Sequence, residues 1–445
     1  MRTVFVLGAG LSHAISDAMP LTDELGNLVR ARVPEAAARS PRGFKGGYFE
    51  AWLSRLAEAQ PDLLDHENAT NYGLFLRVLH EIHGIIRERE LEVLKGEPSW
   101  WLRRLVGLMH AGAADVITFN YDTLIEHTVA HSLLATWPSS SPAEGFQLAR
   151  GVPPLHAAAS RRASGGSFRL LKLHGSLDTF WVPGDSSGAT IQRWHLLGGW
   201  GNAREAPEEA RRRDLPGRSP FIVPPAAAKS SFYNNPVTRE LWRSAGEALR
   251  GAGRVALIGY SMPPTDLVTS GMLTDALAGR DVAVDVVNPR PEPIVDRLAD
   301  LGVERGRIKA SLVEDFTDEL ETSAAETVAS KLAGTKPDRS LVVATSSVAA
   351  ARVTGVRRTG DIVRLEIEPV DSLWATTSLD RHRPRTHVTI ATLLEDLDPG
   401  TRIVVAYSDG SEAAIVSVGE WQRDTGLGSG RWAVLVPSAI PEPVA

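Results

Sequence analysis

The sequence feature that most constrains the fold is a series of short apolar segments, each followed at once by small or polar residues. Stretches of helical periodicity separate these segments, which lie at Val4–Leu7, Val116–Phe119, Phe168–Leu173, Arg254–Ile258 and Val282–Val287. Strands that alternate with helices and are apolar on both faces form parallel sheets that helices cover. The segments therefore predict an α/β fold, a parallel sheet flanked by helices.

Helical patterns fill much of the chain between these segments. The longest is an insertion at about residues 40–111, where one helical face carries Phe75, Leu79, Ile82 and Ile86. Further helices are expected from Thr22 or Asp23 to about Val33, from Asp122 to about Leu134, and over 236–250, 291–301 and 313–333. We expect a loop over 135–166, an irregular stretch over 177–219 and a short strand at Phe221–Val223.

The chain changes character after residues 336–340, which we interpret as a linker. Alternating segments follow at Ala350–Val356, Ile362–Ile367, Val388–Leu393, Ile403–Tyr407, Ala414–Val418 and Trp432–Val436. Short strands separated by turn signals predict a small antiparallel barrel or sandwich. We therefore expect one domain at residues 1–335 and an all-β domain at residues 341–445. The sequence leaves open whether the second domain binds a peptide or a nucleic acid.

Composition excludes several kinds of protein. The chain has no cysteine, which rules out disulfides, thiolate zinc sites, iron–sulfur clusters and cysteine nucleophiles. Its net charge of −6 gives no general reason to expect nucleic-acid binding. No apolar run approaches the roughly 20 residues of a membrane-spanning helix. Residues 1–18 have some features of a secretory signal, but two glycines interrupt the apolar run. We therefore predict a cytoplasmic protein without membrane contact.

The first apolar segment runs into Gly8, Ala9 and Gly10, with Ser12 close behind. Small residues after a strand let the backbone approach a phosphate, although a tight turn alone accounts for them equally well. The third glycine of a dehydrogenase fingerprint would fall at His13, and no clear second strand ends in an acid about 20 residues further on. A hydride-transfer enzyme is therefore disfavoured.

Two further segments end in residues with the chemistry of a site. Asn120 and Asp122 follow the second segment, and one of them is expected to cap the next helix. Capping does not account for both. His174 follows the third segment and precedes Gly175 and Ser176. A lone histidine is usually structural, but one at a strand end suits general-base work because its pKa lies near neutrality.

The last two segments also end in polar residues. Gly259 and Ser261 follow one of them, and Asn288 follows the other. Backbone N–H and hydroxyl groups there can bind phosphate or ribose, and an asparagine amide can bind a ribose hydroxyl or an adenine edge. Because ligands of parallel sheets lie beyond the carboxyl ends of the strands, we expect all of these clusters to face one site.

The chain resembles the sirtuin superfamily in an ordered series of short motifs: GAGLS, MPLTDEL, TFNYD, KLHGS, IVPP, IGYSMPPTD and VNP. More narrowly, it is similar to the zinc-module-free, NAD-hydrolysing sirtuin-like domains of bacterial antiphage defence proteins. The likeness covers about residues 1–310 and does not include the tail. It implies a Rossmann-like sheet in a catalytic domain that takes NAD as its substrate.

The resemblance also implies roles for individual residues. Asn120 would orient the nicotinamide ribose and the attacking water, Asp122 would bind the carboxamide of nicotinamide, and His174 would be the general base. The remaining motif residues would hold the rest of NAD: Gly8, Ala9, Gly10 and Ser12 at the phosphates and nearby ribose, and Gly259, Ser261 and Asn288 at the adenosine half.

Two departures from sirtuin deacylases narrow the implied activity. Deacylases carry a four-cysteine zinc module, which this chain cannot form, so no zinc or other metal is expected. They also carry a Gly-Ile-Pro-Asp-Phe-Arg-like segment, where this chain reads Ala-Met-Pro-Leu-Thr-Asp at residues 18–23. The defence-type domains share both departures, so protein deacylation is disfavoured.

The resemblance thus implies an NAD+ glycohydrolase that releases nicotinamide and ADP-ribose, a regulated NAD-depleting effector of antiphage defence. An unregulated NAD+ hydrolase would kill its host, so we expect control by homo-oligomer assembly, a regulatory protein partner or a phage-derived trigger. Two alternatives stay open. The same residues could transfer or cyclise ADP-ribose, or the site could be a non-catalytic sensor of NAD or a nucleotide, with the β domain as its output.

Overall fold

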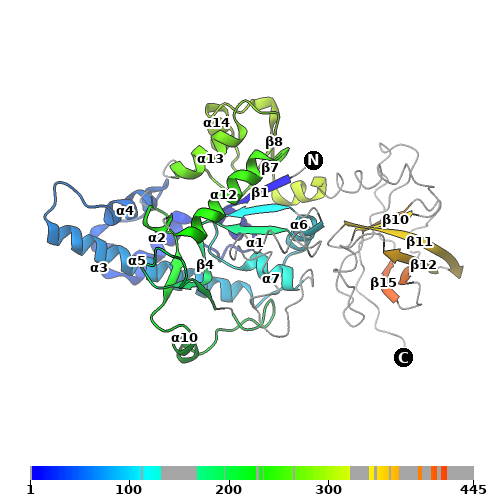
Figure 1. Ribbon diagram of the computed structural model, residues 1–445, viewed down its shortest axis with the longest axis horizontal. Coiled ribbons are helices and arrows are strands. Elements are labelled where there is room, and N and C mark those ends of the chain that lie inside the picture. Colours follow the sequence, from blue (N-terminus) through cyan, green and yellow to red (C-terminus); the bar gives the residue numbers. More distant parts are fainter. Residues whose placement is uncertain are drawn as a thin grey trace.

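The computed structural model describes residues 3–111, 114–131, 168–194, 196–226, 230–233, 235–263 and 266–320 and, further along the chain, six strands between residues 340 and 417. Figure 1 shows the chain from end to end. Within the described residues the strands form two six-stranded sheets and one three-stranded sheet.

The main sheet is parallel throughout. Its strands lie in the order β3 (Arg169–Lys172), β2 (Asp115–Thr118), β1 (Thr3–Leu7), β7 (Arg254–Ile258), β8 (Ala283–Val287) and β9 (Ile308–Ser311). Counted along the chain, this is the order 3-2-1-4-5-6 of a doubly wound Rossmann sheet. The predicted Rossmann-like fold is confirmed. Strand β9 was not predicted, because this edge strand is partly exposed and carries no apolar run.

The helices largely follow the predicted pattern. They are α1 (Ala9–Ile15), α2 (Thr22–Arg32), α3 (Pro34–Arg39), α4 (Tyr48–Ala57), α5 (Asp65–Val93), α6 (Trp100–Ala111), α7 (Leu124–His131), α10 (Glu208–Asp214), α11 (Ser230–Tyr233), α12 (Pro236–Arg250), α13 (Leu267–Leu277) and α14 (Glu292–Asp300). Residues 313–320 are also helical. The predicted loop at 135–166 and the last parts of the helices predicted from Asp122 to about Leu134 and over 313–333 lie outside the described residues.

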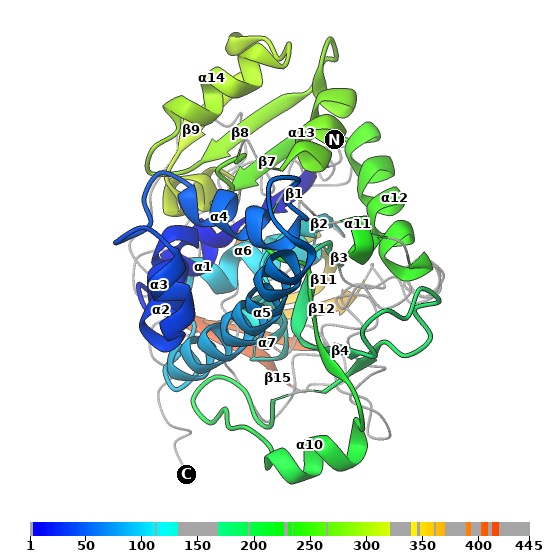
Figure 2. The same ribbon diagram turned by 90° about the vertical axis from the view of Figure 1, so that its left-hand side faces the viewer.

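Side chains along β1 point alternately to the two faces of the sheet, and helices cover both faces. Phe5 and Leu7 pack into one apolar core with side chains of α2, α4 and α5, such as Ile82. Val4 and Val6 point the other way, into a second core with side chains of α12, α13 and α14. Figure 2 shows α12 and α13 on one side of these strands and α2 and α5 on the other.

The stretch predicted as irregular, residues 177–219, contains regular structure, and that prediction was wrong. Strand β4 (Gly175–Trp181) pairs with β5 (Gln192–Arg193) and β6 (Ser219–Ile222) in an antiparallel sheet. The chain reverses at Gly175, whose φ of +80° favours glycine, and a Cβ there would lie 2.1 Å from the carbonyl oxygen of Phe221. The motif around His174 was interpreted as a strand end, which hid the strand that begins directly after it.

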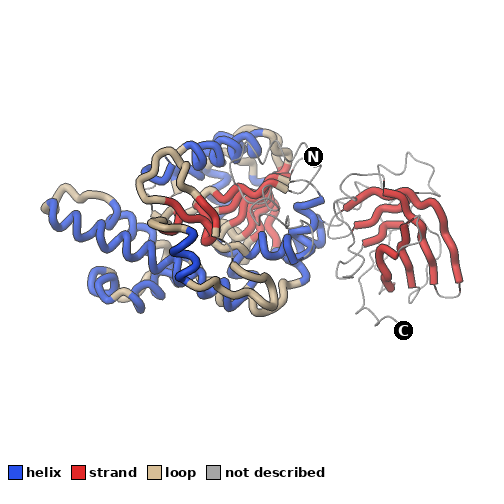
Figure 3. Tube along the Cα trace, turned by 60° about the horizontal axis from the view of Figure 1, so that its bottom comes forward, coloured by secondary structure: helices blue, strands red, loops and turns tan. Residues whose placement is uncertain are grey.

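The strands beyond residue 340 form the second six-stranded sheet, which Figure 3 shows apart from the main sheet. Its order is β13 (Thr389–Thr392), β10 (Ser340–Ala344), β11 (Val348–Thr359), β12 (Ile362–Pro369), β14 (Arg402–Tyr407) and β15 (Glu412–Ser417). Neighbours are antiparallel except β12 and β14, which are parallel. Strand β10 begins at the last residue of the predicted linker, and the strand predicted at Trp432–Val436 lies outside the described residues.

Candidate active site

Two glycine turns meet where the strand order of the main sheet reverses. Strand β1 ends before Gly8 and strand β7 ends before Gly259, and the two strands are neighbours. The amide of Gly8 donates to the carbonyl of Ile258 at 3.0 Å, and the amide of Gly10 donates to the carbonyl of Gly259 at 2.9 Å. The point at which strand order reverses is where ligands of doubly wound sheets bind.

These glycines are needed because the two turns touch each other. A Cβ at Gly8 would lie 2.6 Å from the Cα of Tyr260, and one at Gly10 would lie 2.8 Å from the Cα of Gly259. Gly259 itself has a φ of +61°, and a Cβ there would lie 2.1 Å from the amide nitrogen of Leu11. Because the amides of Gly8 and Gly10 already donate to the carbonyls of Ile258 and Gly259, these two glycines would help a ligand by clearing space and not by donating to it. Their contact with phosphate stays a prediction.

Three of the predicted site residues form one hydrogen-bonded set. The Ser12 hydroxyl donates to Oδ2 of Asp122 at 2.6 Å, and Nδ2 of Asn120 donates to the Ser12 hydroxyl at 2.9 Å. Asn120 Nδ2 also donates to the carbonyl of Gly8 at 3.0 Å. The sequence separations exceed 100 residues, so the sheet creates this set by placing the ends of β1 and β2 side by side.

Asp122 carries two roles at once. Its Oδ1 accepts from the amide of Leu124 at 3.3 Å, so it caps the start of α7 as the sequence indicated. Its Oδ2 faces Ser12. Burial raises the pKa of the Asp122 carboxyl, while the Lys172 ammonium and the Ser12 hydroxyl act to lower it. Capping and membership of the site are therefore compatible.

Helix α5 reaches the same loop from behind. Oε1 of the fully buried Glu90 accepts from the amide and the hydroxyl of Thr123, at 2.5 and 2.7 Å. Arg87 pairs with Glu90 at 2.9 Å and donates to the carbonyl of Leu177 at 3.1 Å. Burial lowers the pKa of His83, on the same helix, to about 3, so its ring is neutral at pH 7. The helical insertion thus contacts the loop that follows Asn120 and strand β4, which follows His174.

His174 lies in the turn between β3 and β4, and its side chain is buried. Its ring centroid is 4.9 Å from that of Phe119, the residue before Asn120, and 6.3 Å from that of Trp242. Phe119 in turn stacks on Tyr260, with centroids 4.9 Å apart and rings 29° from parallel. An aromatic cluster therefore joins the ends of β3, β2 and β7 around His174.

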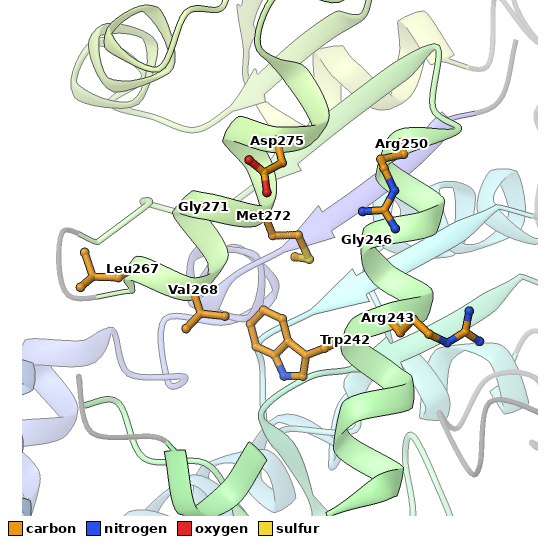
Figure 4. Close-up of a pocket in the computed structure, with 9 residues that line it drawn as sticks. All are labelled: Trp242, Arg243, Gly246, Arg250, Leu267, Val268, Gly271, Met272 and Asp275. Carbon is orange, nitrogen blue, oxygen red and sulfur yellow. The ribbon is translucent and has the colours of Figure 1, made fainter. Parts of the chain in front are cut away.

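A groove opens beside this cluster, between α12 and α13, with a volume of about 410 Å³. Figure 4 shows Trp242, Val268 and Met272 along it, with Arg250 and Asp275 on opposite walls. Trp242 belongs both to the groove and to the aromatic cluster. The groove thus extends outward from the surroundings of His174.

The predicted adenosine-binding residues lie on the other side of β1, at the ends of β7 and β8. The amide of Gly259 donates to the carbonyl of Val287 at 3.0 Å, which holds the two strand ends together. Ser261 is exposed, and Oδ1 of Asn288 accepts from the amide of Arg290 at 2.9 Å. In the same loop Met262 has a φ of +50°, and it is the one described non-glycine residue with a positive φ.

All ten predicted site residues follow strands of the main sheet, but not all are in mutual contact. Gly8, Ser12, Asn120 and Asp122 are linked directly, whereas Ser261 and Asn288 lie one and two strands beyond β1. Sequence reasoning assigned no role to Lys172, Glu126 or Glu90. For Lys172, the available signal was a lysine within an apolar strand segment. Glu90 lies in a run of charged residues and Glu126 is a single acid in a largely apolar helix, and neither pattern gave a signal.

Two searches of the described residues were negative. No group of three or more histidine, aspartate or glutamate side chains lies close enough together to hold a metal ion in that part of the chain. Among the described helices, none combines the length and the apolar character needed to cross a membrane.

Comparison with solved structures finds a distant likeness to Sir2 structures. No protein-family model and no curated protein matches it. A structure from work on the mechanism and regulation of Sir2 enzymes has 13% identity and a TM-score of 0.36, over 74% of this chain and 93% of that chain. A mutant Sir2 homologue in complex with ADP-ribose has 15% identity and a TM-score of 0.37, with the same coverage. A mutant Sir2 with a p53 peptide and NAD has 13% identity and a TM-score of 0.31, over 73% and 93%. Because these TM-scores lie below 0.5, the fold assignment rests on the strand order and not on the likeness.

Proposed function

We propose that the chain binds NAD+ along the carboxyl edge of the main sheet and hydrolyses the bond between nicotinamide and ribose. The observation that carries this proposal is the set of Ser12, Asn120 and Asp122, hydrogen-bonded at the point where strand order reverses. The resemblance of the motifs to sirtuin-like NAD hydrolases supports the choice of ligand.

The length of the edge fits a dinucleotide. The polar residues follow five neighbouring strands, from His174 after β3 to Asn288 after β8. Neighbouring strands are ~4.8 Å apart, so the edge between these two residues measures roughly 19 Å. An elongated ligand with two nucleotide halves can lie along such an edge with its diphosphate near the glycine turns of β1 and β7.

The chemistry fits the residues at the β2 and β3 ends. Cleavage of the nicotinamide–ribose bond builds positive charge on the ribose, so it needs a polar, preorganised pocket more than a strong nucleophile. Both bonds of the Asn120 side chain use Nδ2, so Oδ1 is placed to orient a water or a ribose hydroxyl. Asp122 would bind the carboxamide, and its negative charge suits the cationic ring of NAD+. His174 would take the proton from water.

The test is NAD+ consumption by purified protein, with products separated by chromatography. We expect nicotinamide and free ADP-ribose from the wild type and at most a trace from His174→Ala or Asn120→Ala. The exposed His66 provides a matched control, and His66→Ala should retain activity. If the product were cyclic or protein-linked ADP-ribose, the activity would be cyclisation or transfer and not hydrolysis. NAD+ binding without turnover, unchanged in His174→Ala, would favour a sensor.

The wider role that we propose is that of a regulated, NAD-depleting effector of antiphage defence, with the β domain at residues 341–445 or assembly of several copies providing control. This part rests on the resemblance and on the toxicity of unregulated NAD+ loss. Cells that express the protein with its trigger should lose NAD+, and cells with Asn120→Ala should not. Equal loss in both would remove Asn120 from the mechanism.

A further inference from the structure

A buried lysine lies directly behind the proposed nicotinamide pocket. Lys172, the last residue of β3, is 4% exposed. Its Nζ donates to the carbonyl oxygen of Asp122 at 2.5 Å and to Oε1 of Glu126 at 3.0 Å. A lysine ammonium has three hydrogens to donate, and the third contact is with the carbonyl oxygen of Tyr121, at 3.4 Å. The side chain thus joins the end of β3 to the first turn of α7.

The same ammonium acts on two buried carboxylates, on Glu126 by a direct ion pair and on Asp122 through space. Asp122 and Glu126 are each 8% exposed. Together with Lys172, Ser12 and Asn120 they line one small cavity of about 10 Å³. Burial raises the pKa of both carboxyls, and the Lys172 ammonium is the largest influence that lowers them. An uncompensated charge at this depth would be strongly unfavourable.

Other buried cations near this cluster have partners of their own. Arg87 on α5 pairs with Glu90 at 2.9 Å. Arg193 on β5 lies 3.2 Å from Asp178 on β4. Asp122 and Glu126 therefore depend mainly on Lys172, while the Glu90 carboxylate acts on Asp122 in the opposite direction by repulsion.

We infer that Lys172 is a positioning residue for the proposed reaction: it holds the backbone at Asp122 and favours the charged form of the Asp122 carboxyl beside Ser12 and Asn120. Glu126 holds the ammonium in place from the α7 side. The inference rests on the proposed function, because a charged Asp122 matters most to a cationic nicotinamide ring. It assigns no bond-making role to Lys172, which is turned toward the backbone of the loop.

The test compares Glu126→Gln with the double variant Lys172→Met/Glu126→Gln. Removing Lys172 alone would leave two buried carboxylates without a cation and could unfold the protein, whereas the double variant leaves only Asp122 without one, and that carboxyl can take up a proton. In the double variant we expect the acid limb of kcat/KM for NAD+ to move about 1–3 pH units upward, because Asp122 then holds its proton to higher pH. In Glu126→Gln the limb should not move upward. If the acid limb of kcat/KM falls at the same pH in the two variants, the inference is overturned.

A second readout does not depend on turnover. The infrared carbonyl band of a protonated carboxyl reports on Asp122 when spectra are compared with those of an Asp122→Asn reference. That band should disappear at a higher pH in the double variant than in Glu126→Gln. If it disappears at the same pH in both, Lys172 does not control Asp122, whatever the protein does with NAD+. If the band shifts but the wild type neither binds nor cleaves NAD+, the proposed function fails and the control of Asp122 stands.

Discussion

The two halves of the sheet edge are built differently. On the β2 and β3 side, the side chains are buried and bonded to one another across long sequence separations, as Asp122 is to Ser12 and Lys172 is to Glu126. On the β7 and β8 side, Ser261 is exposed, the Asn288 side chain accepts from a backbone amide two residues away, and the Asn288 amide donates to the carbonyl of Ser311. One half is held by side-chain bonds between strand ends, and the other by backbone bonds.

This difference matches two different tasks. A group that must stabilise charge as it develops needs fixed donors and acceptors that do not reorganise during the reaction. A group that only holds the far end of a ligand can rely on local backbone geometry and adjust on binding. We therefore expect changes in the buried half to affect turnover, and changes in the exposed half to affect affinity.

The largest effect that would follow from this comparison is loss of turnover at the buried end. His174→Ala should lower kcat by roughly 10²–10⁴-fold, the usual contribution of a general base. Its KM should change little, because the side chain is not proposed to hold NAD+. Steady-state kinetics with separated products measure both constants. A rise in KM with kcat unchanged would place His174 among the binding residues. It would contradict the division of the edge into a turnover half and a binding half.

A second large effect concerns the contact that joins the two halves. Gly259→Ala places a side chain at a φ of +61° and against the amide of Leu11, at 2.1 Å. Backbone strain of this kind costs about 1–3 kcal/mol, before any displacement of the β1 turn. Denaturant unfolding should show at least that loss.

Gly271 provides the matched control for this variant. It lies within α13, and an added Cβ would meet nothing within 4 Å. Gly271→Ala should therefore leave stability the same or raise it by up to about 1 kcal/mol through helix propensity. Equal losses from both variants would mean that the contact between the two turns is not what holds the halves together.

A smaller effect is the pH dependence of stability from Asp122. Because burial raises its pKa in the folded protein above the usual value, the folded state binds a proton more readily than the unfolded state. Stability is therefore lost as pH rises from about 4 through the folded pKa, by about 1.4 kcal/mol for each unit of difference. Asp122→Asn should lack this part of the slope in denaturant unfolding between pH 4 and 7. Parallel slopes for the two proteins would contradict the assignment.

The sequence predicted the outer frame of this site better than its interior. Each strand end that carries Gly8, Asn120, His174, Gly259 or Asn288 was found because an apolar run stops there, and parallel strands bring such ends to one edge. The bond between Ser12 and Asp122 could not be predicted, because it depends on β1 and β2 being neighbours and not only on their existence.

Other parts of the site left no local signal. Lys172 lies within an apolar segment, and the sequence does not say whether its ammonium reaches solvent or a buried partner. Glu90 lies in a run of charged residues that fits an exposed helix surface, yet it is fully buried. Strand β4 was missed because Gly175 and Ser176 have the composition of a turn, while the residues after them pair with β6.

The smallest effect belongs to the exposed half of the edge. Ser261→Ala and Asn288→Ala should each weaken NAD+ binding by a few-fold, about the 0.5–1.5 kcal/mol of one hydrogen bond, with kcat unchanged. Asn288→Ala should have the larger effect, since its Oδ1 also holds the turn at Arg290. Calorimetry with NAD+ and with ADP-ribose separates affinity from turnover, and both ligands should lose affinity equally because both contain the adenosine half. A loss confined to NAD+ would move these residues to the nicotinamide end, and a fall in kcat would show that the two halves of the edge share one task.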